Sequence, residues 1–451
     1  MITTALTALV LVAQDGVALR AAPSDSAPQQ AQLVQGDALE VRGRRLDHLQ
    51  VWDHRRERAG YVRATQVKAI DPVPANAPQL LAVTRFLRDQ PGSEALGIAY
   101  AAAYLKAVPQ VDAEAFDAIG HFAERLARRA SRQGGALASA QVEAAATYGV
   151  KFQSLERDGA VQLCYDGDAY RRVLALAAHA ELQARAVLAL TRHDCIDPLL
   201  KPGERHAVDE ERAALLSRID PVALPAPLSH RLRLRRAGVW SQLAFDAARS
   251  GKPEPALMQL AIDSLAGVDR NELPDDDLGD YNDAALRVGA TRWAAEPVPA
   301  TPGALRIEAG EPGQTCVRLG DLRRCTYGVV WAASQRADAA GRTIALAVQP
   351  LAGWRELWLF RRGEAGWTVD VLPPAASEPQ LGYVEFAGFV PGAAKLLVAR
   401  EVRAEGRFQR RFEVLALDTL AVDKSASTPQ LLVLFGKWQD AAWKRQTVSL
   451  R

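Results

Sequence analysis

The sequence has no apolar run long enough to cross a bilayer. The longest run near the N-terminus, Ala8 to Ala13, is far shorter than the about 20 residues that a membrane-spanning helix needs. No Lys or Arg precedes Arg20, so the basic region that opens a signal peptide is missing. The run therefore predicts a strand. If the protein is exported, we expect its leader to have been removed or to lie upstream of Met1.

An excess of charge of one sign is also missing. The 55 Lys and Arg nearly balance the 53 Asp and Glu, which leaves a net charge of +2. That balance does not supply the electrostatic footprint of a nucleic-acid-binding protein, and we expect no nucleic-acid partner. Apolar residues make up 49% of the chain, which excludes intrinsic disorder. At roughly 150 residues per domain, a chain of 451 residues predicts about three domains.

The common catalytic and metal-binding motifs are absent. The sequence contains no H-E-x-x-H, G-x-S-x-G, G-x-x-x-x-G-K-[ST], G-x-G-x-x-G or C-x-x-C, and these are the motifs of metal, nucleophile and phosphate chemistry. The last histidine is His230, so the C-terminal third has no histidine for catalysis. The acidic stretch 275–280 lacks the order of a calcium-binding EF-hand. The sequence therefore predicts no catalytic residue, no cofactor and no metal site.

Two proline-rich stretches, 71–78 and 295–303, divide the chain. Proline ends helices and central strands and stiffens spacers. Before the first stretch, short Val- and Leu-rich runs predict strands; between the two, Ala, Leu and Arg recur at helical spacing; after the second, alternation predicts strands again. We therefore expect a multidomain α+β protein with domains at 1–71, 78–295 and 303–451.

The first domain carries a recognisable succession of short motifs. Eight of its residues match the motif positions of one family in order: Val17, Leu19, Arg20, Pro23, Gly36, Trp52, Gly60 and Val62. The segment resembles the bacterial SH3 family, whose members open with V-x-L-R-x-G-P-S and end with G-W-V. Two positions depart from it, since Ala22 and Tyr61 stand where the family has Gly and Trp.

The resemblance implies a small β-barrel that binds peptides or cell-wall material through aromatic side chains and loops. It nominates Trp52, His54 and Tyr61 as ligand-binding residues, with the charged run 53–58 between them. In the alternative interpretation, Trp52 and Tyr61 are core residues and the charged run is a solvated hairpin tip. Fewer than about 70 residues give a thin core, so the stability of this domain would depend on docking to the next one.

The middle domain is expected to be built of helical hairpins. Asp112 is placed to cap a helix that ends at Gly134, and a β-hairpin turning at 157–159 is expected within 150–165. Trp240, Leu243 and Ala244, with Ala256 and Leu260 downstream, partly resemble one tetratricopeptide repeat. That resemblance implies that Ala256 and Leu260 pack the second helix of a hairpin.

The last domain contains a weak internal repeat. The segments 343–360 and 395–417 each resemble part of a β-propeller blade. A propeller needs four to eight blades, so we expect an open sheet, a sandwich or a fragment with exposed edges. The apolar residues from Leu431 to the end, including 447–450, are expected to return to an earlier strand and close one edge. Deletion of 430–451 should then cause aggregation.

The four cysteines predict two disulfides. Pairing outward from the hairpin turn Gly320–Asp321 sets Cys316 opposite Cys325, with Cα atoms about 4.5 Å apart. Cys164 and Cys195 lie at the two ends of a helical stretch, 166–194, which as a straight helix would hold them more than about 40 Å apart. A bend near 177–181 is therefore required for this pair to form.

Two bonds would imply an oxidising compartment, and the longer loop would contribute about 3.5 kcal/mol. The alternative is four buried thiols in a cytosolic protein.

These observations favour an exported or periplasmic protein that binds or scaffolds other envelope components, without catalysis. The expected partner is a protein, a peptide or cell-wall material. A cell-wall-directed hydrolase with its active site in the helical domain, and a cytosolic interaction adaptor, remain the alternatives.

Overall fold

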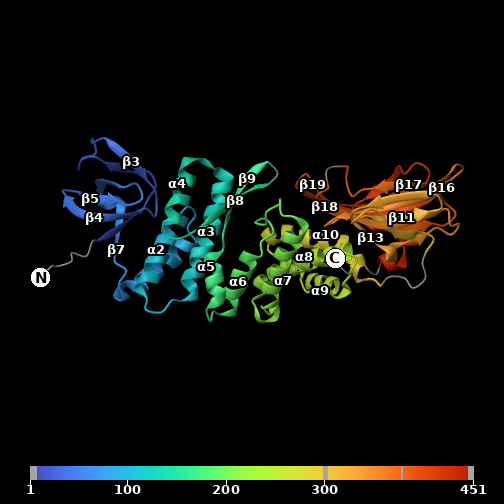
Figure 1. The fold of residues 1–451 in the computed structure, drawn as a ribbon, viewed down its shortest axis with the longest axis horizontal. Coiled ribbons are helices and arrows are strands. Elements are labelled where there is room, and N and C mark those ends of the chain that lie inside the picture. The colour runs from blue at the N-terminus through green and yellow to red at the C-terminus, as the bar shows by residue number, and fades with distance from the viewer. Residues whose placement is uncertain (1–7, 158, 298–302, 377–378, 445–451) are drawn as a thin grey trace. The chain divides into compact units, whose positions relative to one another are not determined.

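The computed structural model describes residues 8–157, 159–297, 303–376 and 379–444. The chain forms two compact units, an N-terminal unit of residues 1–200 and a C-terminal unit of residues 201–451, and each is described by itself. The chain is mixed α+β, with an N-terminal antiparallel sheet, a helical region and a C-terminal all-β region, as expected from the sequence (Figure 1). The helices are shared between the two units, which the sequence analysis did not predict.

The N-terminal unit opens with an antiparallel sheet in the order β3-β2-β6-β5-β4-β1-β7. Its strands are β1 (Leu9–Val12), β2 (Val17–Arg20), β3 (Gln29–Leu33), β4 (Ala38–Arg45), β5 (His48–Asp53), β6 (Arg58–Arg63) and β7 (Val67–Ile70). All seven contribute to one core, which includes Val10, Leu19, Leu39, Val51 and Val62. A sheet whose first and last strands share a core must curl around it.

Strand β1 is apolar on both faces because it has two sets of neighbours. Val10 and Val12 point into the core of the sheet, whereas Leu11 packs with Leu96 and Ile98 of the helices. Two loops of the sheet also make polar contacts with the helical part of the unit. Gln141 donates to Asp15 at 2.9 Å, and the Tyr148 hydroxyl donates to the Gly36 carbonyl at 2.6 Å. The sheet is thus docked on the helices of its own unit.

In the described part of the N-terminal unit, six α-helices and a hairpin follow the sheet. They are α1 (Ala77–Arg88), α2 (Glu94–Ala107), α3 (Ala113–Gln133), α4 (Gly135–Ala146), β8 (Phe152–Arg157), β9 (Ala160–Tyr165), α5 (Asp168–Ala175) and α6 (Ala180–Leu190). Asp112 caps α3 by accepting from the Ala115 amide at 3.0 Å, and Gly134 ends it with a φ of 59°. The bounds of α3 and the β8–β9 hairpin agree with the sequence predictions, although Asp158, in the expected turn, lies outside the described residues.

The helices of the C-terminal unit are α7 (Pro202–Ser217), α8 (Ala226–Arg249), α9 (Pro255–Ala266) and α10 (Leu278–Thr291). Helices α8 and α9 form the hairpin expected from the repeat-like motif, but its packing residues differ. Met258 and Ala261 are fully buried, whereas Leu260 is 47% exposed and Ala256 is exposed. The implied packing role of Ala256 and Leu260 is therefore wrong, because α9 turns a different face to α8.

The C-terminal β region contains a three-stranded sheet and a nine-stranded sheet. The small sheet comprises β10 (Arg306–Ala309), β11 (Thr315–Leu319) and β12 (Leu322–Thr326). The large one comprises β13 (Val329–Val330), β14 (Arg336–Ala337), β15 (Thr343–Leu351), β16 (Trp354–Gly363), β17 (Gly366–Leu372), β18 (Leu381–Val390), β19 (Lys395–Ala404), β20 (Arg407–Ala416) and β21 (Val422–Ala426). The two repeated segments are the hairpins β15–β16 and β19–β20, which lie in this one sheet.

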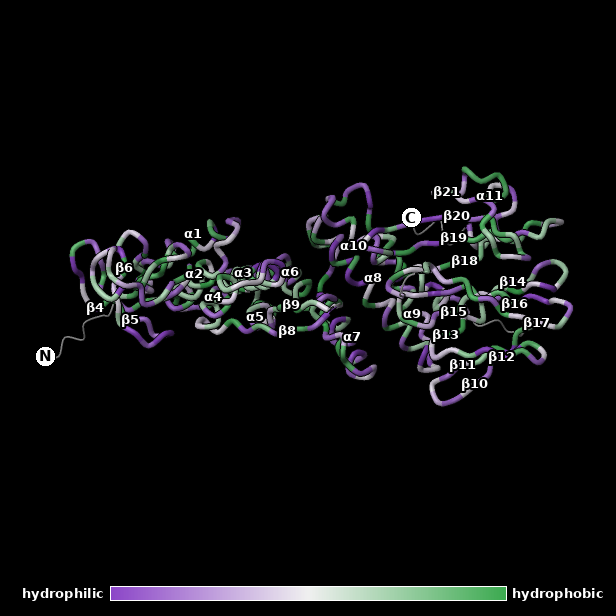
Figure 2. Tube along the Cα trace, turned by 90° about the horizontal axis from the view of Figure 1, so that it is seen from above, coloured by the Kyte–Doolittle hydropathy of each residue, from purple (hydrophilic) through white to green (hydrophobic). Residues whose placement is uncertain are grey.

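Apolar residues line both faces of the central strands. Ile344 and Leu346 of β15 pack with Val317 of the small sheet, whereas Ala345 packs with Leu359 and Val384 on the opposite face. Figure 2 shows hydrophobic and hydrophilic residues alternating along the trace of each unit. Helix α10 covers part of the large sheet, where its Leu286 packs with Tyr383 of β18. This close approach requires glycine at position 289, because a Cβ there would lie 2.3 Å from the Tyr383 ring.

The tail of the chain does not close a sheet edge as a strand. Strand β21 pairs with β20 at that edge, and the tail forms the short helix α11 (Val433–Trp438). Phe435 and Trp443 pack on the face of the sheet against Phe412 and Val414. The expectation of an edge strand is therefore wrong for the described tail, and residues 447–450 lie outside the described residues. Among the described residues, no helix has the length and apolar character to span a membrane.

Candidate functional site

The nominated aromatic residues lie on the solvent side of the N-terminal sheet. Along β5 and β6 the buried residues Val51 and Val62 point inward, so the alternation of a strand directs Trp52 and Tyr61 outward. Both are partly exposed. We call the surface formed by Glu40, Arg42, Trp52, His54 and Tyr61 the aromatic face.

Trp52 is held by charged neighbours from the adjacent strand. The Arg42 guanidinium lies 4.7 Å from the centre of the Trp52 ring, within cation–π range. Glu40 stands directly opposite Trp52 in the β4–β5 register. Arg42 thus covers the Trp52 ring, and Glu40 is the cross-strand neighbour of Trp52. The β4–β5 register could have indicated Glu40, whereas Arg42 lies at a register shift and could not be found in this way.

His54 is the most exposed member of the aromatic face. Its Nε2 lies 2.7 Å from Glu40 Oε2, and its side chain is 64% exposed. Its ring centroid is 6.4 Å from that of Trp52, in an edge arrangement. The hydrogen bond with His54 is the main cause that lowers the pKa of Glu40, and Arg42, 3.3 Å from the same carboxylate, acts in the same direction.

Tyr61 lies on the same face of the sheet as Trp52, on the neighbouring strand β6. Trp52 is paired with Ala59, and Tyr61 with Gln50, so the two aromatic residues are diagonal neighbours on one face. Such positions lie about 7–8 Å apart, within reach of aromatic side chains. The structure therefore brings together all three residues nominated from the sequence.

The charged run after Trp52 is anchored at two positions. Arg55 lies 2.9 Å from Asp37 and 3.0 Å from Glu143 of α4, and Arg56 lies 2.7 Å from the buried Asp53. Burial raises the pKa of Asp37, although the Val34 amide and both arginines act against the rise. The interpretation of this run as a freely solvated tip is therefore wrong for Arg55 and Arg56.

Both cysteine pairs expected from the sequence lie at disulfide distance. The Cys164 and Cys195 sulfurs are 2.08 Å apart with Cα atoms 5.8 Å apart, and those of Cys316 and Cys325 are 2.06 Å apart with Cα atoms 3.9 Å apart. The β11–β12 register is the predicted one, from Leu319 opposite Leu322 to Cys316 opposite Cys325. Helices α5 and α6 are separated at 176–179, which confirms the predicted bend.

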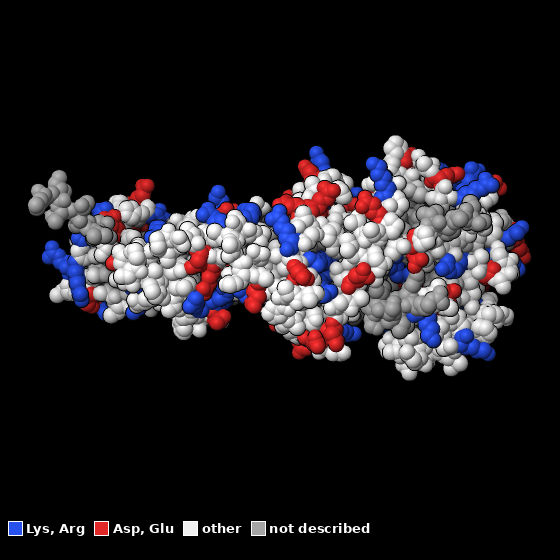
Figure 3. Space-filling model, turned by 90° about the horizontal axis from the view of Figure 1, so that it is seen from below, with Lys and Arg blue, Asp and Glu red and all other residues white. Residues whose placement is uncertain are grey.

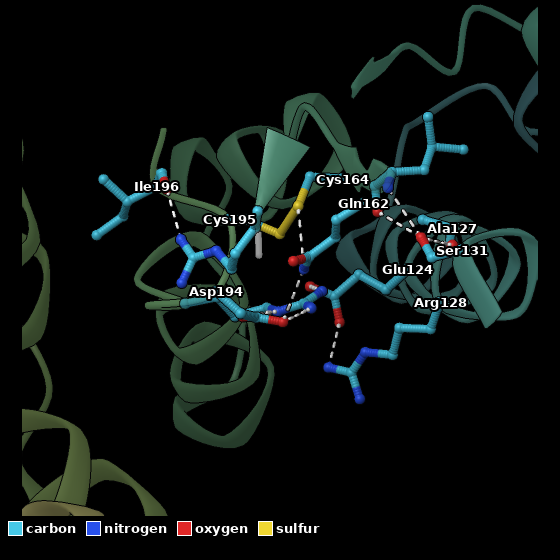
Figure 4. The surroundings of a disulfide bond; sticks show 12 residues. Glu124, Ala127, Arg128, Ser131, Gln162, Cys164, Asp194, Cys195 and Ile196 are labelled. Carbon is cyan, nitrogen blue, oxygen red and sulfur yellow. Dashed lines mark hydrogen bonds and ion pairs between the residues drawn. A yellow bond between two sulfur atoms is a disulfide. The ribbon is translucent and has the colours of Figure 1, made fainter. Parts of the chain in front are cut away.

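The first disulfide joins the β8–β9 hairpin to the segment after α6 (Figure 4). Gln162 donates to Asp194 at 3.3 Å, and the Leu163 amide donates to the Ser131 hydroxyl of α3 at 2.8 Å. Burial opposes ionisation of Asp194, but the hydrogen bond and charge of Arg192 outweigh it and lower the pKa of this carboxyl. The disulfide thus closes a polar cluster built on α3.

Replacing Cys164 and Cys195 together with Ser should lower the free energy of unfolding of the N-terminal unit by about 3.5 kcal/mol, because their loop spans 31 residues. The same change at Cys316 and Cys325, which close a loop of 9 residues, should cost the C-terminal unit about 2.5 kcal/mol. Urea unfolding followed by a probe in each unit measures both values. If either double variant lowered the free energy of unfolding of both units equally, the assignment of one disulfide to each unit would be wrong.

The described residues contain no group of three or more His, Cys, Asp or Glu side chains that could hold a metal ion. On the face that Figure 3 shows, basic and acidic side chains are interspersed. A cleft of ≈ 380 Å³ is lined by residues of the 3-10 helix Arg270–Glu272, of α10, and of β19 and β20. This cleft could not be predicted from the sequence, because its walls come from segments that lie far apart in the chain.

Comparisons with protein-family models, with curated proteins and with solved structures find no match for this chain.

Proposed function

We propose that this chain is a non-catalytic binding or scaffolding protein of the bacterial envelope, and that the aromatic face is its recognition surface. The observation that carries the proposal is the partly exposed Trp52, held between Arg42 and His54. Aromatic and arginine side chains together dominate the binding energy of recognition surfaces. The resemblance of residues 1–71 to bacterial SH3 domains supports the same surface and suggests a peptide or cell-wall ligand.

An oxidising location is supported by the two cysteine pairs at disulfide distance. Disulfides persist in exported proteins and are rare in the cytosol. Titration of thiols in the denatured protein, purified without reductant from its native compartment, tests this part of the proposal. Four reactive thiols would favour the cytosolic adaptor instead.

The hydrolase alternative receives no support from the described cleft. Glu401 is the one carboxylic acid among its lining residues, whereas glycoside hydrolysis generally uses a pair of carboxyl groups. We therefore keep binding as the proposed function.

Replacing Trp52 with Ala should weaken binding to envelope material by about tenfold, as expected for a central aromatic contact. Because the side chain is partly exposed, the free energy of unfolding should fall by about 1 kcal/mol, compared with about 3 to 5 kcal/mol for a buried Trp. Cosedimentation with purified cell-wall sacculi and binding to immobilised envelope proteins measure the first value, and urea unfolding measures the second.

Tyr327, an aromatic residue 60% exposed elsewhere on the chain, supplies the matched control as Tyr327→Ala. Its binding should equal that of the unaltered protein. A Trp52 variant that loses stability without a separable loss of binding would refute the recognition role.

A further inference from the structure

The cleft in the C-terminal unit has the dimensions of a small-molecule site. Its volume of ≈ 380 Å³ falls within the about 300–1,000 Å³ typical of such sites. Tyr281 of α10 is 6% exposed and Leu286 is 3% exposed, so they form a buried apolar wall, while Phe408 of β20 is 39% exposed. The cleft thus offers apolar surface that is already in place and partly open to solvent.

Two guanidinium groups line the same cleft. Arg270 lies 5.9 Å from the centre of the Tyr281 ring, and Arg410 Nε lies 3.0 Å from Glu401 Oε1 with a side chain 42% exposed. Within the described part of the chain, Arg270 forms no ion pair and Arg410 forms none besides that with Glu401. Each therefore retains N–H donors that face solvent.

Glu401 does not neutralise both arginines. Its side chain is 10% exposed, and burial raises its pKa to about 8 despite the attraction of Arg410, with Glu385 acting in the same direction as burial. The lining residues thus include two guanidinium groups and one carboxyl group. The cleft keeps a net positive charge even when Glu401 is ionised and paired with Arg410.

We propose that this cleft binds a small organic carboxylate that carries a flat apolar group. A guanidinium presents paired donors that match the two oxygens of a carboxylate, and the apolar part of the ligand would contact Phe408 and Tyr281. This site is separate from the aromatic face and does not depend on the proposed envelope function.

The first test compares three probes of similar shape and different charge: benzoate, benzamide and benzylammonium. Ligand-observed NMR on the full chain at millimolar probe concentration measures the affinity of each. Benzoate should bind about tenfold more tightly than the other two, because it is the only anion of the three and its two oxygens can form ion pairs with the arginines. Tighter binding of benzylammonium, or no binding of benzoate, would overturn the proposal.

The second test uses variants with opposite expected signs. Arg270→Gln and Arg410→Gln should each weaken benzoate binding by about tenfold, whereas Glu401→Gln should leave it unchanged or tighten it, because Arg410 loses its competing carboxyl. Arg407→Gln is the matched control, since Arg407 is exposed on the same strand and does not line the cleft.

Thermal unfolding of each variant should show that the unit remains folded, because both arginines are exposed. If Arg407→Gln reduced binding as much as the other two substitutions, or if Glu401→Gln abolished it, the assignment of the cleft to a carboxylate would be wrong.

Discussion

Replacing Glu385 with Ala is expected to lower the free energy of unfolding of the C-terminal unit by about 3 to 5 kcal/mol. Glu385 of β18 accepts from Arg355 at 2.7 Å and from Arg292, and the exposed fractions of these side chains are 2%, 0% and 6%. Without the shared carboxylate, both buried guanidinium groups would lose the ion pair that each makes with Glu385. Burial lowers the pKa of Arg355 despite the attraction of Glu385, so a charge without this carboxylate would be unfavourable here.

The cluster explains how the helices of this unit are joined to its sheet. Arg292 follows α10 directly, whereas Arg355 lies on β16 and also donates to the Ala290 carbonyl at 3.3 Å. Glu385 therefore connects the end of α10 to two strands. The loss should be measurable by urea unfolding monitored by tryptophan fluorescence.

Glu308→Ala supplies the control, because Glu308 pairs with Arg323 at 3.1 Å on the surface, with side chains 37% and 47% exposed. An exposed pair contributes about 0 to 1 kcal/mol. A Glu385→Ala variant no less stable than Glu308→Ala would show that the buried cluster contributes little to stability.

Replacing Phe435 with Ala should cost the same unit about 3 to 5 kcal/mol, as expected for a large aromatic side chain in a core. Phe435 is fully buried, and its ring centre lies 5.7 Å from that of Phe412 and 5.8 Å from that of Trp443. Removal of 430–451 should have a larger effect. It would expose the sheet face around Phe412 and Val414, and the protein should aggregate because a large apolar patch becomes accessible.

Light scattering and size-exclusion chromatography measure the association state of the truncated chain. Val433→Ala is the control for the point variant, because Val433 is 85% exposed in the same helix, and it should change stability by less than about 0.5 kcal/mol. A truncated chain that stays soluble and monomeric with an unchanged melting temperature would contradict the role assigned to the tail.

Short-range features of this protein follow from its sequence. Counting residue pairs outward from a two-residue hairpin turn places Cys316 opposite Cys325. The alternation of side chains along β5 and β6 places Trp52 and Tyr61 on one face. The bend between α5 and α6 follows from the need to bring Cys195 to Cys164. These predictions succeed because strand alternation, turn geometry and the length of a helix are properties of the local chain.

Tertiary packing decided the rest. Leu260 and Met258 are both apolar residues of α9, and the neighbouring α8 determines that Met258 is buried and Leu260 is exposed. The tail contains enough apolar residues for an edge strand, but β21 already pairs with β20, so the tail packs on the sheet face instead.

The cleft and the ion cluster could not be predicted either. Arg292 and Glu385 are 93 residues apart in the chain, and Arg270 and Arg410 line one cleft from segments that are even further apart. Local periodicity shows which side of a strand or helix a residue occupies. Which distant side chains then meet depends on how α10 packs on β18 and β19, and that contact is determined by the shapes of both surfaces together.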